Sequence, residues 1–144
     1  MTFDAQLRTA LQSIHAKPTP GEARAIIDVA RLAAAADKKT DLSETVVLLA
    51  LSKIVCDMAG VTEIPDPTAQ IDPKRLMEIG ESLVPNGARE LAYACAFLVM
   101  IQDLELTKEE SQLANGLADA LVIQPDRAKQ LASQMETLVR SARK

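Results

Sequence analysis

The chain has 144 residues, of which 48% are hydrophobic and 2% are aromatic, and its formal net charge is −4. This length fits one domain whose core is built from Ala, Leu, Val, Ile and Met side chains. A general nucleic-acid binder needs basic patches and rings that stack on bases, so the negative charge and the content of one Tyr, two Phe and no Trp argue against that class.

The spacing of apolar residues predicts an all-α fold of seven helices in a single domain spanning residues 1–144. Pro18 ends the first helix, because the residue before a proline avoids the helical conformation. Thr19, Pro20 and Glu22 form a capping box that starts the second helix, and Gly60 ends the third. The predicted helices cover residues 3–16, 20–36, 42–59, 72–84, 88–102, 108–121 and 125–142.

Charged residues on the first two helices have structural explanations. Asp28 lies between Arg24 and Arg31 at spacings of four and three, which predicts a surface ladder of ion pairs. His15 borders the apolar stripe of the first helix, and we interpret it as a partly exposed structural residue, because no nucleophile motif accompanies it.

Small residues indicate packing rather than chemistry. Residues 85–87, Pro-Asn-Gly, predict a turn between the two halves of the chain. Gly116 and Ala50 occupy equivalent positions in the two halves and indicate a close approach of helices.

Cys56 and Cys95 form no CxxC motif and are expected to be buried thiols in a reduced, cytoplasmic setting.

One hairpin pattern occurs twice. An apolar helix ends at Asp37 in the first copy and at Asp103 in the second. A capping residue then starts the next helix in each copy, and Glu44 or Glu110 follows this residue by three positions. The offset between the copies is the same for the aspartates and for the glutamates (103 − 37 = 110 − 44), which predicts a duplicated helical hairpin.

These four acidic residues are the candidate metal ligands: Asp37, Glu44, Asp103 and Glu110. The two glutamates are also explained by capping boxes, in which the carboxylate accepts the N–H of the capping residue. The two aspartates lie at helix C-termini, where a carboxylate is unfavourable, so they indicate a specific role. An Asx turn and a divalent-cation site both satisfy that role.

The second hairpin is the better candidate for a cation. Lys38 and Lys39 dilute the acidic charge of the first hairpin, whereas the second sets four carboxylates against Lys108. The spacing matches neither an EF-hand nor the Glu-x-x-His pattern of di-iron bundles. A zinc site built from imidazoles is excluded, because the chain has a single histidine.

The paired hairpins resemble the TerB-like tellurite-resistance family over approximately residues 21–131. In that family, an Ala-rich helix ends in an Ala-Asp-Gly turn, a small polar cap and an acidic helix start follow, and the unit recurs once. The resemblance rests on Ala36, Asp37, Glu44, Asp103, Leu104, Glu105, Leu106, Thr107 and Glu110. The family's glycine after Asp is replaced here by Lys38 and Leu104.

The resemblance implies a cytoplasmic bacterial protein linked to stress responses, with metal bound at the acidic positions. It also implies a role in interaction with other proteins rather than an enzymatic reaction. The N-terminal residues carry no signal-peptide pattern. The longest apolar run, residues 91–101, is too short to span a membrane.

Two other functions stay open. A carboxylate di-metal enzyme requires both hairpins at one end of the bundle, and we expect helices 20–36 and 88–102 to run antiparallel, which separates the hairpins. A purely structural oligomer would use the apolar seam of the last helix, which packs either within the chain or on a partner. This seam contains Ala128, Leu131, Met135, Leu138 and Ala142.

Overall fold

The computed structural model contains six helices and no strand in the part of the chain that it describes. The described residues are 3–36, 42–61, 79, 83, 86–101 and 108–142. The helices are α1 (Phe3–Ile14), α2 (Pro20–Ala36), α3 (Leu42–Ala59), α5 (Asn86–Met100), α6 (Lys108–Ala120) and α7 (Pro125–Ala142). The all-α prediction is confirmed. The predicted helix over residues 72–84 lies outside the described residues, apart from the buried Ile79 and Leu83.

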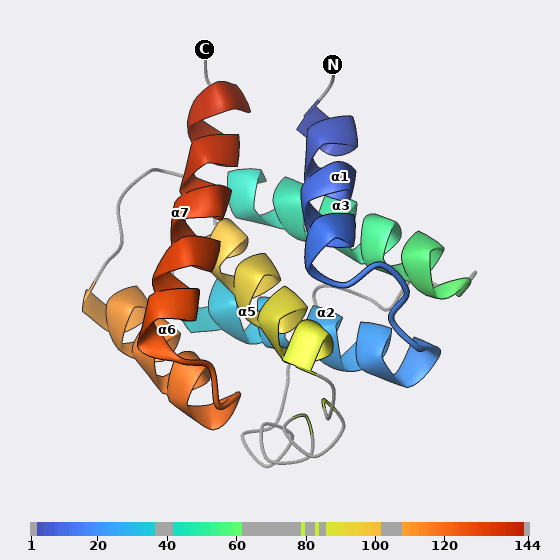
Figure 1. The fold of residues 1–144 in the computed structure, drawn as a ribbon. Helices are drawn as coiled ribbons and strands as arrows, with labels where there is room; N and C mark the ends of the chain where they lie inside the picture. The colour runs from blue at the N-terminus through green and yellow to red at the C-terminus, as the bar shows by residue number, and fades with distance from the viewer. Residues whose placement is uncertain are drawn as a thin grey trace.

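Helices α2 and α5 form the centre of the molecule (Figure 1), and their mutual contact is the largest between described helices. Helix α3 packs on α2, and α7 packs on α5. Helix α1 contacts α3, α5 and α7. One cluster of buried apolar side chains includes residues from all six of these helices.

The two central helices are buried on nearly all sides. All α5 residues from Leu91 to Met100 are buried. Along residues 22–31 of α2, Arg24 alone is exposed. A helix surrounded by protein requires apolar side chains around its whole circumference, and small alanines let the neighbouring backbones approach. The prediction that the apolar run at 91–101 is buried is therefore confirmed.

Local signals predicted most helix starts correctly, but not the start of α5. Residues 85–87 predicted a turn, whereas Asn86 and Gly87 are the first two residues of this helix. The glycine serves a different purpose: a Cβ at Gly87 would lie 2.7 Å from Nδ1 of His15. A glycine is required here by the close approach of another element and not by a turn.

Gly116 does not mark a close approach. It is exposed on α6, and a Cβ added there would meet no atom within 4 Å. The prediction of a close helix contact at Gly116 is wrong. The repeat offset pairs Gly116 with Ala50 in sequence, but it says nothing about which face of a helix each position occupies.

The apolar seam of α7 packs within the chain. Ala128, Leu131 and Met135 are buried, and α7 contacts both α5 and α1. Arg127 Nε also donates to Glu90 Oε1 at 2.7 Å, which ties the start of α7 to α5. Of the two alternatives for this seam, the structure therefore has the intramolecular one.

Helices α3 and α6 end in the same backbone motif with different residues in its left-handed position. After α3 this residue is Gly60, with a φ of 75°, and after α6 it is Val122, with a φ of 55°. In both cases the next residue donates its N–H to a carbonyl five positions earlier, as in a Schellman motif. A β-branched residue is strained in this conformation, and the Val122 side chain is 71% exposed.

We expect Val122→Gly to raise the free energy of unfolding by about 1 kcal/mol, because it removes the strain and gives up little buried apolar area. Urea unfolding followed by circular dichroism measures the change. Gly60→Val is the matched control at the end of α3, and it should lower stability by about 1–2 kcal/mol. A loss of stability in Val122→Gly would show that the valine is not strained.

Candidate functional site

The four predicted metal ligands fall on the two hairpins, and the structure describes only part of these. Asp37 and Asp103 lie outside the described residues. Glu44 and Glu110 belong to α3 and α6, where each is the third helical residue, although their side chains also lie outside the described set. The third position is the one that a capping-box glutamate occupies. Metal binding at these residues stays a prediction.

The helix starts repeat with the spacing of the sequence motif. Helices α2 and α5 begin at Pro20 and Asn86, and helices α3 and α6 begin at Leu42 and Lys108. The difference in starting position is the same for both pairs (86 − 20 = 108 − 42). The second helices differ in length, since α3 has 18 residues and α6 has 13. The common spacing therefore extends from each central helix to the start of the helix after it.

Helices α2 and α5 run in the same general direction, from right to left in Figure 1. Their first turns are linked through His15, whose ring contacts Glu22 of α2 and lies against Gly87 of α5. The expected antiparallel arrangement is therefore wrong. The C-terminal ends of both helices, which lead toward the two acidic hairpins, lie on the same side of the molecule (Figure 1).

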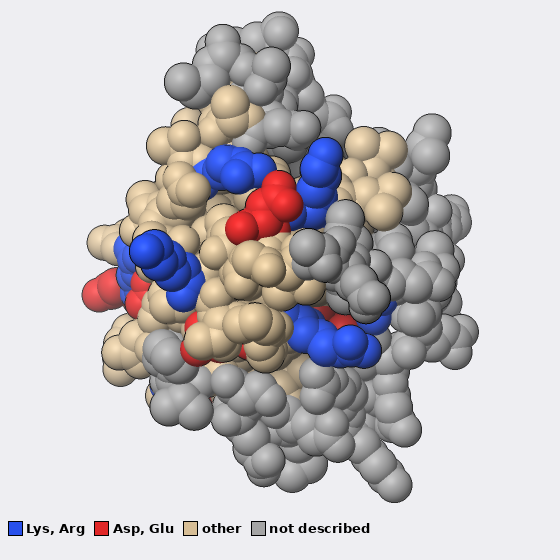
Figure 2. All heavy atoms as spheres, turned by 90° about the vertical axis from the view of Figure 1, so that its right-hand side faces the viewer, with Lys and Arg blue, Asp and Glu red and all other residues tan. Residues whose placement is uncertain are grey.

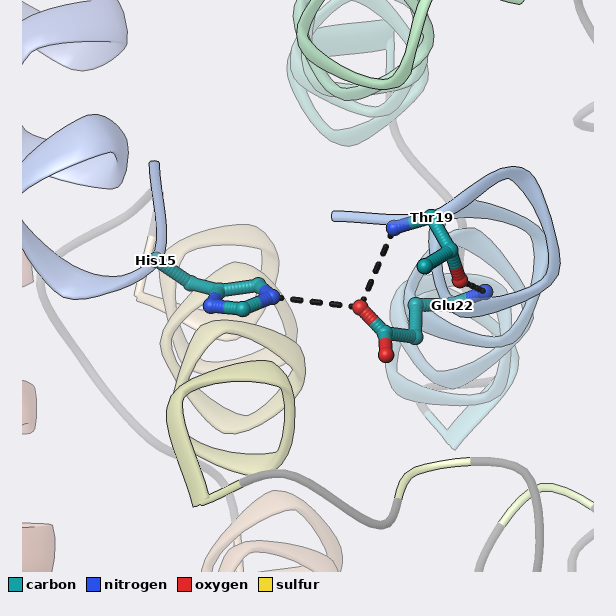
Figure 3. A network of polar contacts seen from close by, with 3 residues as sticks. All are labelled: His15, Thr19 and Glu22. Carbon is teal, nitrogen blue, oxygen red and sulfur yellow. Dashed lines mark hydrogen bonds and ion pairs between the residues drawn. The ribbon is translucent and has the colours of Figure 1, made fainter. Parts of the chain in front are cut away.

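A small polar network surrounds the start of α2 (Figure 3). Thr19 N–H donates to Glu22 Oε1, and Glu22 N–H donates to Thr19 Oγ1, both at 3.1 Å. These two bonds are the predicted capping box. His15 Nε2 lies 3.1 Å from the same Glu22 oxygen, and the side chains of His15 and Glu22 are only 22% and 11% exposed.

His15 joins three elements. Its Nε2 contacts Glu22 of α2, while the other side of its ring lies against Gly87 at the start of α5. A Cβ at Gly87 would also lie 3.3 Å from the carbonyl oxygen of Ile14 in α1. An imidazole held between a capping carboxylate and a backbone serves as a structural joint, in agreement with the role predicted for it.

Asp28 and Arg31 form a buried ion pair, so the predicted surface ladder is wrong. Arg31 Nη1 donates to Asp28 Oδ1 at 3.2 Å. The Arg31 side chain is 8% exposed and the Asp28 side chain is 6% exposed. Arg24 is exposed, in contrast. The spacing of three residues correctly predicted that Asp28 and Arg31 form a pair. Because α2 is a central helix, however, the face that carries this pair is covered by protein.

Within this pair, the guanidinium is incompletely satisfied. Arg31 Nε is buried and has no hydrogen-bond partner. Two charged side chains inside a protein lose hydration, and their mutual attraction must offset that cost. Removing one member of the pair would therefore leave the other charge buried without compensation.

The two cysteines are free and buried, as predicted. Burial raises the pKa of the Cys95 thiol from 9.0 to about 12. Burial, followed by the nearby charge of Asp57, also raises the pKa of Cys56. A reactive cysteine needs access and a lowered pKa, so both thiols behave as small apolar side chains.

The Cys95 thiol should make stability depend on pH in the alkaline range. Its pKa is about 12 in the folded chain against 9.0 for an exposed thiol, so the unfolded chain loses its proton first. The thiol's contribution is full below pH 9 and is lost as the pH rises toward 12.

Between pH 8 and pH 10, we expect this thiol to account for about 1 kcal/mol of lost stability. Denaturant unfolding of the wild type and of Cys95→Ala at both pH values isolates this contribution. The variant should lose less stability over the interval than the wild type. Equal losses would contradict the predicted role of this thiol.

Figure 2 shows basic and acidic side chains close together on the face where α2 begins and α3 ends, with no extended patch of one sign among the atoms described on that face. The described part of the chain also exposes a small apolar patch on α3. Val46 and Leu49 on α3 are 56% and 45% exposed. These two residues are three apart and share one outward face of the helix.

Within the described part of the chain, no helix is long and apolar enough to cross a membrane. No group of three or more His, Cys, Asp or Glu side chains in those residues is placed to hold a metal ion.

Comparison of the chain with protein families, curated proteins and solved structures finds no match.

Proposed function

We propose that this protein is a non-enzymatic, TerB-like helical module of the bacterial cytoplasm that serves protein contacts in a stress response. In this proposal a divalent cation binds at the acidic hairpins, through Asp37 and Glu44 in the first and Asp103 and Glu110 in the second. Carboxylates and loop carbonyls supply the oxygen ligands that hard cations require.

The equal spacing of the helix starts is the observation that carries this proposal. Two pairs of helices begin at one common offset, and the four candidate ligands have the same offset (86 − 20 = 108 − 42 = 103 − 37 = 110 − 44). Each Asp therefore follows a central helix, and each Glu lies in the first turn of the next. A repeat of both helix positions and acidic residues supports a common role for the two hairpins.

The apolar patch on α3 supports the contact half of the proposal. Val46 lies two residues after Glu44, and Leu49 lies on the same face less than one turn further along. A cation bound at the first hairpin would hold the start of α3, the segment that presents this patch. Cation binding and a protein contact would then be linked through one short stretch of helix.

Calorimetric titration with Ca²⁺, Mg²⁺, Mn²⁺ and Zn²⁺ tests the cation. We expect at least one of these ions to bind the wild type, and Asp103→Asn to weaken its binding tenfold or more, because a ligand charge is lost. Asp119→Asn is the matched control: it removes the same charge from an exposed residue of α6 outside the hairpins.

The outcomes separate the two halves of the proposal. If no ion gives a binding heat, or if Asp119→Asn weakens binding as much as Asp103→Asn, the cation site is wrong. Light scattering of the same samples over a concentration series reports self-association. A monomer at all concentrations, with and without the ion, would exclude a second copy as the partner.

A carboxylate di-metal enzyme is the second candidate, and the direction of the central helices favours it. Since α2 and α5 run the same way, their C-terminal ends lie on one side of the molecule (Figure 1). A shared site there would bind two ions per chain at a short separation. Mn²⁺ titration followed by electron paramagnetic resonance would then show coupled ions, whereas two independent hairpin sites would show isolated ones.

A further inference from the structure

We draw no further inference here: the strongest candidate, the exposed apolar patch of Val46 and Leu49 near the start of α3, carries none because nothing in the structure shows what covers it.

Discussion

Asp28→Asn should lower the free energy of unfolding by about 3–5 kcal/mol, the range seen when one member of a buried ion pair is removed. The substitution keeps the shape of the side chain but leaves the Arg31 charge without its counter-ion. The Arg31 side chain is only 8% exposed, so water cannot replace the lost carboxylate without a local opening of the structure. Urea or guanidinium unfolding at neutral pH measures the loss.

Asp57→Asn provides the matched control for this experiment. Arg8 Nη2 and Asp57 Oδ2 are 3.0 Å apart, but their side chains are 43% and 46% exposed. An exposed pair contributes about 0–1 kcal/mol, because water and salt screen its attraction. If Asp28→Asn costs no more than Asp57→Asn, the Arg31 charge reaches solvent and the pair is not buried as described.

A double variant separates the lost attraction from the cost of the remaining charge. Asp28→Leu combined with Arg31→Met removes both charges and keeps apolar volume on α2. Replacement of a buried pair by apolar residues is often neutral or stabilising. We therefore expect the double variant to be more stable than Asp28→Asn by roughly 2 kcal/mol or more, because it leaves no buried charge without a counter-ion.

Gly87→Ala is expected to destabilise the protein by about 1–3 kcal/mol, the usual cost of adding a methyl group to a filled space. The new Cβ would lie 2.7 Å from His15 Nδ1, and the ring cannot simply turn away, because Nε2 is engaged with Glu22. Thermal or denaturant unfolding gives the magnitude. The steric contact between position 87 and His15 is confirmed if the loss of stability caused by Gly87→Ala is at least halved in a His15→Ala background.

Gly116→Ala is the opposite case and serves as the control. Gly116 lies in the interior of α6 in open space, so alanine meets no neighbour there. Alanine is favoured over glycine in a helix, and a gain of about 0.5–1 kcal/mol is expected. A loss at Gly116 similar to that at Gly87 would mean that the steric contact with His15 is not the cause of the effect.

Helix boundaries were predictable where capping residues and glycine determine them locally. Thr19, Pro20 and Glu22 predicted the start of α2, and the hydrogen bonds of the capping box are present. Gly60 predicted the end of α3 in the same way. These signals operate over one turn of helix, so they do not depend on the rest of the fold.

The environment of individual residues was less predictable, because contacts distant in sequence determine it. The spacing of Asp28 and Arg31 predicts their pairing but not their burial, which results from α2 lying at the centre of the fold. Gly87 resembles a turn residue in sequence, and only its contact with His15, which lies far earlier in the chain, explains it. The same limit applies to the relative direction of α2 and α5.

For the candidate site, the sequence predicts which residues repeat but not whether they meet. Glu44 and Glu110 lie at the third positions of their helices, as the capping pattern requires. Convergence of Asp37 with Asp103 depends on how the two helix pairs cross, and a local pattern contains no such information. The parallel sense of α2 and α5 therefore affects the metal hypothesis more than any motif does.

The pairing of α2 with α5 has a consequence for the order of events during synthesis. The principal contact of the molecule joins one segment that begins at Pro20 with another that begins at Asn86, so loop-closure entropy must be lost before this contact forms. While the ribosome has made only the first half, α3 is available to pack on α2, but the apolar face of α2 that packs on α5 has no partner. The nascent chain therefore exposes this apolar face until α5 has emerged, and exposed apolar surface of this kind makes unfinished chains prone to aggregation.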